Sequence, residues 1–587
     1  MSIISDLSQR FGDAFVSIGF ESDWGMVVPS QRPELAHYQC NGALGAAQRS
    51  GRDPRGLAAE VIGAIDHDSL FASLDVAGPG FINITVTDPV LADHIQSMDD
   101  DEQLGIRPAD PSLKVLVDYG GPNMSKSMHV GHLRASIIGE SLKRLFRLVG
   151  HDVDGDIHLG DWGMPVGQLI IELESRHPEL PYFDPDYTGP YPTESPVTLD
   201  GLSEMYPVVV ERTKADPKEA ERSRQATFDL QNGRPGYVAL WQHFHDVSVE
   251  EQRRDFEDLG IEFDLWRGES TVHDRLAPLV DRLTNENIAI ESDGAVIVEV
   301  ADPSDKKEMP PLLLTRSDGS YLYSTTDLAT LEQRAEDGYD LVLYVVDARQ
   351  GLHFDQVFRA ARRASVVADD MGLEHIAFGT VNGPDGKPFK TRDGGVLRLA
   401  DLIEIVTDAA GRRLDEAEIA REYPAAERDE IATMVGLGAL KFGDLSNHRT
   451  SNYVFDIDRF TSFEGKTGPY LQYGSVRMQS ILRRTAELGL KPGPIVPPTV
   501  PAERDLMLRL LRLPEVIDRA VEIRAPNVLA EYAYEVATDF NRFYEACHIL
   551  SEKDPARQAS WLALVDLALR VLGVLLHALG IEAPERM

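Results

Sequence analysis

Cysteine is scarce in this sequence: only Cys40 and Cys547 occur among 587 residues. They stand far apart and outside any paired cysteine motif, which excludes a disulfide framework and a zinc site built from cysteine pairs. Such low cysteine usage is typical of the reducing cytoplasm, where we expect this protein. The first residues show no basic segment followed by an apolar run, so we expect no secretory signal in them.

Long uninterrupted apolar runs are also missing. The most apolar stretch, residues 561–579, is interrupted by Asp566, Arg570 and His577. This pattern favours an amphipathic or buried helix over a membrane span. We therefore expect a protein without a membrane partner.

Basic residues are too few to balance the acidic ones. The chain has 58 Lys and Arg against 96 Asp and Glu, a formal net charge of -38. Proteins that bind nucleic acids usually present a basic surface, so the total charge by itself argues against an RNA partner. Because charges are screened beyond about 8 Å at physiological salt, a local basic groove is still compatible with this total. A nucleic-acid function must therefore be argued from motifs.

The length and the periodicity of apolar residues predict three domains. Residues 1–105 mix helical and strand patterns and predict an N-terminal α+β domain. Residues 110–404 alternate strands with helices, which predicts an α/β domain with a parallel, doubly wound sheet, and an insertion at about 175–310 interrupts that alternation. Residues 405–587 show almost only helical periodicity and predict an all-α bundle.

A chemically informative segment follows the predicted strand around 115–117, where a helix is predicted to begin near Val130. A helix N-terminus at the carboxyl edge of a parallel sheet offers free N–H groups to phosphates. His129 and His132 lie on one face of the first turn, where both can donate hydrogen bonds to phosphate oxygens. Gly131 lets a nucleotide approach the backbone, and Lys126 adds a mobile cation. An isolated His-x-Gly-His also fits an ordinary helix start or a metal-binding pair.

This segment, with its lead Pro122-Asn123, resembles the signature of class I aminoacyl-tRNA synthetases. Further blocks in the expected order resemble arginyl-tRNA synthetases in particular. The matching blocks are residues 117–134, 158–163, 321–327, 347–350, 385–392 and 463–473, followed by the C-terminal residues 579–587. The resemblance implies a Rossmann-like catalytic domain with an insertion, an additional N-terminal tRNA-binding domain and a helical anticodon-binding domain.

The resemblance also implies the reaction. It is the ligation of L-arginine to tRNA(Arg) in protein synthesis, with ATP as substrate, Mg2+ accompanying ATP, and an arginyl-adenylate as intermediate. We expect a monomer and no further metal site. The alternatives are an arginine-activating paralogue that serves a non-ribosomal pathway, a catalytically silent tRNA-binding protein, and a synthetase for another amino acid.

Individual roles follow from the resemblance residue by residue. The implied catalytic residues are Lys126, His129, His132 and Lys390. The implied ATP-binding residues are Pro122, His129, Gly131, His132, Gly160 and Asp161. The implied arginine-binding residues are Asp118, Asn123, Tyr323, Asp327 and Gln350. The implied tRNA-binding residues are Tyr470, Tyr473, Arg477, Tyr544 and Met587.

Each of these residues also has a plainer interpretation. Without the resemblance, Asp327 is a charge near a helix N-terminus and Tyr323 a strand residue. Aromatic residues of the C-terminal region are more often core than RNA contacts, and the loop around Lys390 fits a solvated basic turn equally well. Met164-Pro165-Val166 departs from the Thr-Gln-Phe-like segment that is usual in the family.

Overall fold

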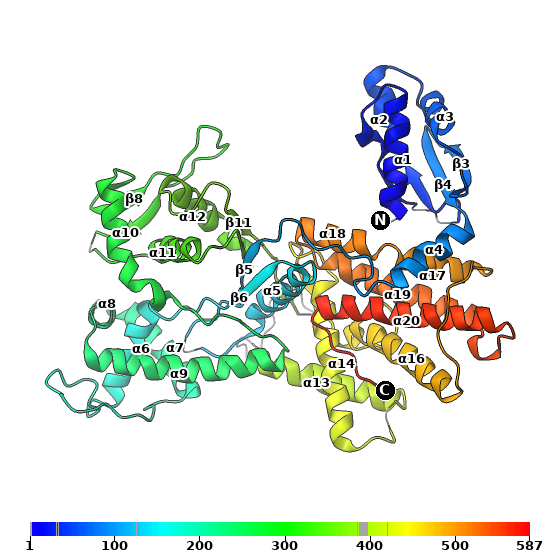
Figure 1. Ribbon diagram of the computed structural model, residues 1–587. Helices are drawn as coiled ribbons and strands as arrows, with labels where there is room; N and C mark the ends of the chain where they lie inside the picture. The colour runs from blue at the N-terminus through cyan, green and yellow to red at the C-terminus, as the bar shows by residue number, and fades with distance from the viewer. Residues whose placement is uncertain are drawn as a thin grey trace. The chain divides into compact units, whose positions relative to one another are not determined.

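The structure is a computed structural model that describes residues 3–30, 32, 34–124, 126–317, 319–383, 386, 397–419 and 421–587. The chain folds into two compact units. The first unit consists of residues 1–107, 463–577 and 582–587, and the second of residues 108–462 and 578–581. In Figure 1 the first unit contains the blue and the orange-to-red parts of the chain.

The second unit is built on a four-stranded parallel sheet. Its strands are β5 (Lys114–Asp118), β6 (Asp152–Asp156), β10 (Leu341–Tyr344) and β11 (Gly372–His375), in the order β11-β10-β5-β6. All neighbours pair in parallel, which confirms the predicted sheet type. Strand order reverses between β5 and β10, and doubly wound folds bind ligands at such a switch point. The sequence placed the last strand at 375–378, whereas β11 ends at His375 and only a single bridge, Asp347 to Phe378, continues it.

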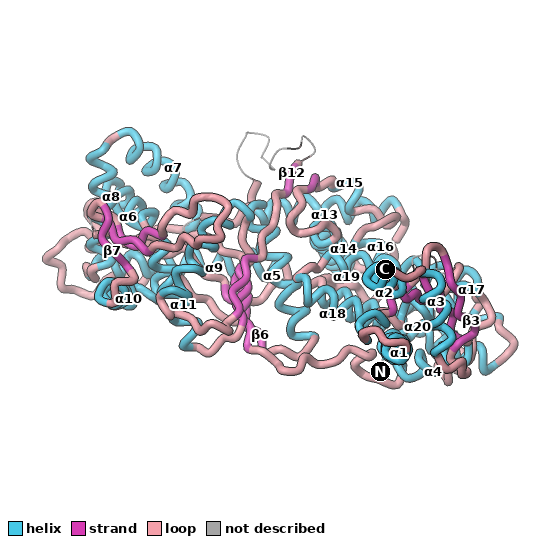
Figure 2. Tube along the Cα trace, turned by 90° about the horizontal axis from the view of Figure 1, so that it is seen from above, coloured by secondary structure: helices cyan, strands magenta, loops and turns pink. Residues whose placement is uncertain are grey.

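The helix predicted after β5 is confirmed as α5 (Val130–Leu148). It packs on β5 and β6, as Figure 2 shows beside the twisted strands. Gly150 follows the helix with a φ of 82°, a left-handed conformation that glycine adopts without strain. The connection therefore turns back directly into β6.

Between β6 and β9 the chain forms the predicted insertion. Its first part is a group of mutually packed helices, α6 (Met164–Arg176), α7 (Leu199–Ala215), α8 (Pro217–Gln231) and α9 (Pro235–Asp258). The departure Met164-Pro165 begins α6, where proline fits because first-turn N–H groups have no helical partner. The 3-10 turn η2 (Glu269–Val272), α10 (His273–Asn285) and the antiparallel strands β7 (Ala289–Ser292), β8 (Ala295–Val298) and β9 (Leu312–Thr315) complete it.

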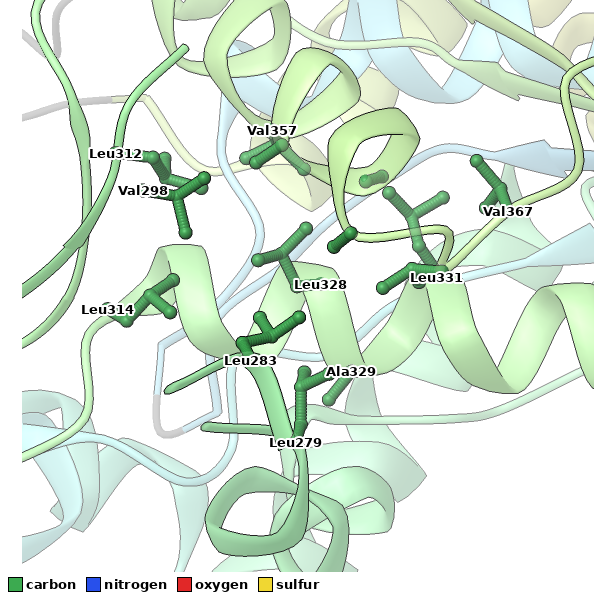
Figure 3. Close-up of a cluster of buried hydrophobic side chains, with 14 of the residues drawn as sticks. Leu279, Leu283, Val298, Leu312, Leu314, Leu328, Ala329, Leu331, Val357 and Val367 are labelled. Carbon is green, nitrogen blue, oxygen red and sulfur yellow. The ribbon is translucent and has the colours of Figure 1, made fainter. Parts of the chain in front are cut away.

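A large apolar core holds the next two helices, α11 (Tyr323–Glu336) and α12 (Gly351–Arg363). Figure 3 shows Leu279 and Leu283 of α10 beside Leu328 and Ala329 of α11. Val357 of α12 belongs to the same buried cluster. This core fixes the start of α11, and therefore the positions of Tyr323 and Asp327 on one face of its first turns.

Three helices that were predicted to be part of the C-terminal bundle belong to the second unit instead, where α5 is among their packing partners. They are α13 (Leu399–Glu416), α14 (Ala425–Leu445) and α15 (Ile457–Phe460), joined by the short pair β12 (Val381–Asn382) and β13 (Tyr453–Val454). The buried Arg134 of α5 lies 3.1 Å from a carboxylate oxygen of Asp444 on α14. Tyr453 donates to the same carboxylate at 2.9 Å. This network anchors the helix that begins at the histidine pair.

The first unit combines a small α+β region with a helical bundle. The α+β region contains α1 (Ile3–Ser17), η1 (Ser22–Gly25), β1 (Val27–Pro29), β2 (Tyr38–Cys40), α2 (Gly42–Ser50), α3 (Pro54–Ala64), β3 (Phe71–Ala77), β4 (Phe81–Val86) and α4 (Asp88–Asp99), with an antiparallel sheet ordered β1-β2-β4-β3. The bundle contains α16 (Gly468–Glu487), α17 (Pro501–Leu510), α18 (Leu513–Ile523), α19 (Asn527–Ala546), η4 (Ile549–Ser551) and α20 (Pro555–Ala578). Cys40 and Cys547 are buried free thiols.

Among the described residues, α20 is the one helix that is long and apolar enough to cross a membrane. Two thirds of its most apolar stretch, 67%, is buried inside the protein, which is the environment of a core helix. Arg570 bonds to the backbone carbonyl of Asp99 at the end of α4. The helix therefore packs as the buried element that the interrupted apolar pattern predicted.

Candidate active site

Two loops that leave β5 and β6 pair at the carboxyl edge of the parallel sheet. The N–H of Met124 donates to the carbonyl of Gly160 at 3.0 Å, and the N–H of Gly160 donates to the carbonyl of Pro122 at 3.2 Å. A Cβ at position 160 would lie 2.5 Å from the side-chain oxygen of Asn123. Glycine at this position therefore leaves the Asn123 amide where it is, whereas a larger residue would push it aside. The structure thus brings together Pro122, the exposed Asn123 and Gly160.

The histidine pair forms a reciprocal cap on α5. Nδ1 of His129 accepts the N–H of Gly131 at 3.0 Å, and Nδ1 of His132 accepts the N–H of His129 at 3.1 Å. Since a backbone N–H can only donate, each Nδ1 is an acceptor and the proton of each neutral ring is on Nε2. The two rings stack with their centroids 4.1 Å apart.

Both histidines are neutral at physiological pH. Burial, with Lys126 as a second cause, lowers the pKa of His129. Burial and the neighbouring His129 lower the pKa of His132 to about 3. Two neutral imidazoles with Nε2–H groups beside a helix N-terminus can donate to an anion, and the positive end of the helix dipole adds to that potential. The N–H groups of residues 129–132 are themselves bonded within the chain, so the donors offered to an anion are the two rings.

The other half of the site lies on α11. Tyr323 is 59% exposed, and Asp327 is on the next turn. Nε2 of His353 on α12 lies 2.6 Å from a carboxylate oxygen of Asp327, and this hydrogen bond raises the pKa of His353. His353 was not among the predicted site residues, although its spacing of three residues from Gln350 places both near the start of α12. Gln350 itself is exposed in the turn that precedes α12.

A second missed residue, Glu269, lies next to this half of the site. Its carboxylate accepts a hydrogen bond from the backbone N–H of Trp162 and interacts electrostatically with Asp327, Asp161 and Tyr323. Burial, followed by the charges of Asp327 and Asp161, raises the pKa of Glu269 to about 8. No periodic pattern marks this position, because η2 becomes part of the site only through its pairing with the loop after β6.

This raised pKa predicts a pH-dependent stability. The stabilising neutral form of Glu269 is fully present below its ordinary pKa of 4.5 and is lost as the pH rises through about 8. Glu269→Gln is neutral at every pH, and its amide oxygen can still accept the Trp162 N–H. Between about pH 5 and about pH 8.5, we expect the free energy of unfolding of Glu269→Gln to rise relative to that of the unmodified protein by about 4 kcal/mol.

Urea unfolding at the two pH values measures this gap. The exposed Asp274, which begins α10 nearby, provides the matched control, because Asp274→Asn should show the same offset from the unmodified protein at both pH values. A Glu269→Gln offset that is also independent of pH would contradict the raised pKa.

Two predicted ligand residues are engaged by the chain itself. The buried Asp118 accepts from Nη2 of the fully buried Arg334 at 2.6 Å, and Arg334 also bonds to Asp156 at 2.9 Å. The side chain of Asp161 is 1% exposed and accepts the N–H and the hydroxyl of Ser270 at 2.9 and 2.6 Å. This carboxylate holds η2 against the loop after β6, and the predicted contact of Asp161 with ATP stays a prediction.

Lys390 lies outside the described residues, and its predicted role stays a prediction. Within the described ranges, no three His, Cys, Asp or Glu side chains are placed to hold a metal ion.

The predicted tRNA contacts gather in the bundle of the first unit. Arg477 of α16 lies over the ring of Tyr544 of α19, with 5.1 Å between its guanidinium carbon and the ring centroid, and 5.9 Å from Tyr473. Asn541 accepts from Arg477 at 3.0 Å and donates to the hydroxyl of Tyr470 at 2.8 Å. We call these five residues the aromatic cluster. They combine a cation with partly exposed rings.

The C-terminal tail runs along the same helix. Gln472 donates to the carbonyl of Glu582 at 2.6 Å, and Arg483 donates to that of Glu585 at 3.0 Å. The partly exposed Met587 follows directly. Both donors belong to α16, so the tail is held on the helix that carries Tyr470, Tyr473 and Arg477.

Comparison with known protein families covers almost the whole chain. Residues 95–457 match the catalytic domain of class I tRNA synthetases (R), residues 471–587 match the DALR anticodon binding domain, and residues 2–86 match the arginyl tRNA synthetase N-terminal domain. The sequence is 49% identical to an arginine–tRNA ligase of Maricaulis maris and 47% identical to one of Alkaliphilus oremlandii. Each alignment covers 100% of both chains.

Solved structures agree with this assignment at the level of the fold. The arginyl-tRNA synthetase of Plasmodium falciparum superimposes with a TM-score of 0.82 at 24% identity, covering 100% of this chain and 99% of that one. The Thermus thermophilus arginyl-tRNA synthetase gives a TM-score of 0.79 at 22% identity, with 100% of both chains covered. Full-length relatives above 40% identity and a catalytic-domain match over most of the sequence show that the chain belongs to the arginyl-tRNA synthetase family.

Proposed function

We propose that this chain activates L-arginine with ATP and transfers the arginyl group to tRNA(Arg) in protein synthesis. The observation that carries the proposal is the pair of neutral histidines at the N-terminus of α5, at the switch point of the parallel sheet. A site of this kind binds the phosphates of a nucleotide. The acidic and aromatic side chains on α11 supply the other substrate subsite.

In the first step the carboxylate of arginine attacks the α-phosphorus of ATP, and the bond to pyrophosphate breaks. Negative charge builds on the phosphate oxygens, so fixed donors accelerate the step. We assign the Nε2–H groups of His129 and His132 to these oxygens. The ammonium of Lys126 is a point charge on a flexible side chain. It can therefore stay close to the negative charge as that charge moves onto the leaving pyrophosphate. The N–H of Gly131 is used internally by His129, and its missing side chain leaves room for the nucleotide.

Arginine recognition requires a carboxylate in front of a guanidinium. We assign Asp327 to this role because a carboxylate can accept two parallel N–H groups, and His353 fixes its orientation. The exposed hydroxyl and ring of Tyr323 lie beside it, and Asn123 and Gln350 bind the α-amino and carboxylate end. Asp118 contributes through its ion pair with Arg334, which sets the end of β5.

We extend the proposal to the magnesium ion, the oligomeric state of the protein and its cellular location. Mg2+ enters bound to ATP, since it is usually held by phosphates and only one or two protein carboxylates. The protein acts as a monomer in the cytoplasm. The N-terminal domain contacts the tRNA, and Lys390 supports Lys126 at the pyrophosphate.

The aromatic cluster is proposed to stack on unpaired tRNA bases. Stacking of one base on an aromatic side chain contributes about 1–3 kcal/mol. We therefore expect Tyr544→Ala to raise the KM for tRNA by roughly 5- to 100-fold, measured by aminoacylation, with an unchanged KM for arginine. Tyr544→Phe keeps the ring over Arg477 and should stay near the unmodified enzyme. Equal losses in both variants would point to the hydroxyl and against stacking.

The proposed reaction is tested by pyrophosphate exchange with each of the twenty amino acids, with and without tRNA. Exchange with arginine alone and only when tRNA is present supports the proposal. Exchange without tRNA would favour an arginine-activating paralogue that serves another pathway. Exchange with no amino acid would favour a silent tRNA-binding protein.

A further inference from the structure

Lys126 has an unusual environment for a surface-loop lysine. Its ammonium lies 4.3 Å from the ring centroid of Tyr206, and burial lowers its pKa. In the described part of the chain, burial is the cause of this lowered pKa, and no carboxylate charge opposes it. The contact that holds this cation is therefore an aromatic face.

The loop and the helix that meet here are docked by apolar packing. Tyr206 belongs to α7, in the insertion, and is packed against a buried cluster that includes Leu202 and Met205 of the same helix. Met124, two residues before Lys126, is 4% exposed and part of that cluster. Because Met124 fixes the loop on the cluster, the short span to Lys126 leaves the ammonium over the ring of Tyr206.

The same ring also adjoins the arginine half of the site. Burial, followed by the charges of Glu269 and Tyr206, raises the pKa of Tyr323, which stands one turn before Asp327. Lys126 in turn influences both histidines. Tyr206 thus contacts the lysine of the phosphate-binding half and acts electrostatically on Tyr323 of the arginine-binding half.

We propose that Tyr206 is a positioning residue that holds the Lys126 ammonium beside the phosphate site, through its ring, until ATP arrives. The inference rests on the proposed function, in which Lys126 acts on the phosphates. An aromatic face suits this task because it attracts a cation without neutralising it. A carboxylate in the same place would keep the charge for itself, and separating such a desolvated ion pair would cost far more than leaving the ring.

Helix α7 of the insertion is part of the phosphate site through the contact of Tyr206 with Lys126. A free lysine on a loop samples many rotamers, and ordering it in the transition state lowers the rate. A lysine already held beside its target loses less freedom. The insertion therefore contributes to catalysis through one ring that touches neither the reacting atoms nor the tRNA.

The test is a double-mutant cycle in pyrophosphate exchange with arginine and saturating tRNA, using the full-length chain. Tyr206→Leu, which removes the ring, should lower kcat/KM for ATP by roughly 3- to 30-fold. The arginine dissociation constant should change by less than about twofold, because the lost contact is with the lysine. Tyr206→Phe keeps the ring and should restore the rate. In a Lys126→Met background, the effect of Tyr206→Leu should disappear.

The outcomes separate the inference from the function on which it rests. If Lys126→Met leaves the exchange rate unchanged, the role assigned to Lys126 is wrong and the positioning role falls with it. If Lys126→Met slows exchange but Tyr206→Leu is silent, or its effect adds fully to that of Lys126→Met, Tyr206 does not act through Lys126. Tyr206→Met, which keeps the bulk of the side chain, replaces Tyr206→Leu if the latter does not fold by circular dichroism, and the same readings apply.

Discussion

Replacing Asp327 with asparagine should reduce kcat/KM for arginine by about 10³- to 10⁴-fold, because a site built to pair a polar group loses this much when the pairing is broken. Asparagine keeps the size of the side chain. It offers a single neutral acceptor where the guanidinium needs two charged ones, and its amide N–H groups point a donor at a donor. Steady-state aminoacylation with varied arginine measures the loss.

Comparing variants of Asp327 and His353 distinguishes a role in arginine recognition from a role in folding. If Asp327 binds substrate, His353→Ala leaves the carboxylate in place but unoriented, and we expect a smaller loss of about tenfold. The hydrogen bond at 2.6 Å is the contact removed in that variant. Asp274→Asn, at an exposed carboxylate in the first turn of the neighbouring α10, serves as the matched control and should be silent. Normal arginine kinetics in Asp327→Asn would remove Asp327 from the guanidinium site.

Much of the phosphate half of the site was predictable because its residues are contiguous. One strand, one loop and one helix turn, residues 115–132, contain the histidines, the lysine and the glycine. Local rules suffice there: a buried apolar run predicts β5, helical spacing predicts α5, and i, i+3 spacing predicts that the histidines share a face. The reaction itself was predicted from the resemblance to a family.

The partners of these residues were not predictable, because they come from distant segments. His353 reaches Asp327 across 26 residues, and Arg334 reaches Asp118 across 216. Tyr206 stands over Lys126 only because the insertion folds back on the loop. Periodicity reports which face of an element is buried, and it carries no information on which distant side chain meets that face.

The same limit applies to Asp161, whose predicted contact with ATP stays a prediction. Asp161 sits in a block typical of the family, and its acidic type by itself suggests contact with a bound substrate. The structure turns it inward, where Ser270 uses both carboxylate oxygens and burial raises its pKa. A carboxylate that holds a loop and one that holds a ligand look alike in sequence, since only the donor across the fold distinguishes them.

Replacing His132 with alanine should lower kcat for adenylate formation by about 10²- to 10³-fold, the loss that is typical when one donor to a developing oxyanion is removed. KM for ATP should change much less, because the Nε2–H bond strengthens only as charge builds on the phosphate. The variant also loses the acceptor for the N–H of His129, a capping contribution of about 1 kcal/mol to stability. Pre-steady-state measurement of adenylate formation reports the rate of the step itself, and a separate unfolding measurement reports the loss of stability.

The pH dependence of the same step distinguishes donation by a neutral ring from donation by an imidazolium. With its pKa lowered to about 3, His132 keeps the same protonation state from about pH 6 to about pH 8.5, so its contribution to kcat should be constant over that range. The ratio of the unmodified enzyme to His132→Ala, measured at each pH, should therefore form a flat line. A ratio that rises as the pH falls towards 6 would mean that the charged ring is the active form, and the reciprocal cap in which Nδ1 accepts from the backbone would then have to open during the reaction, because an imidazolium has no nitrogen left to accept.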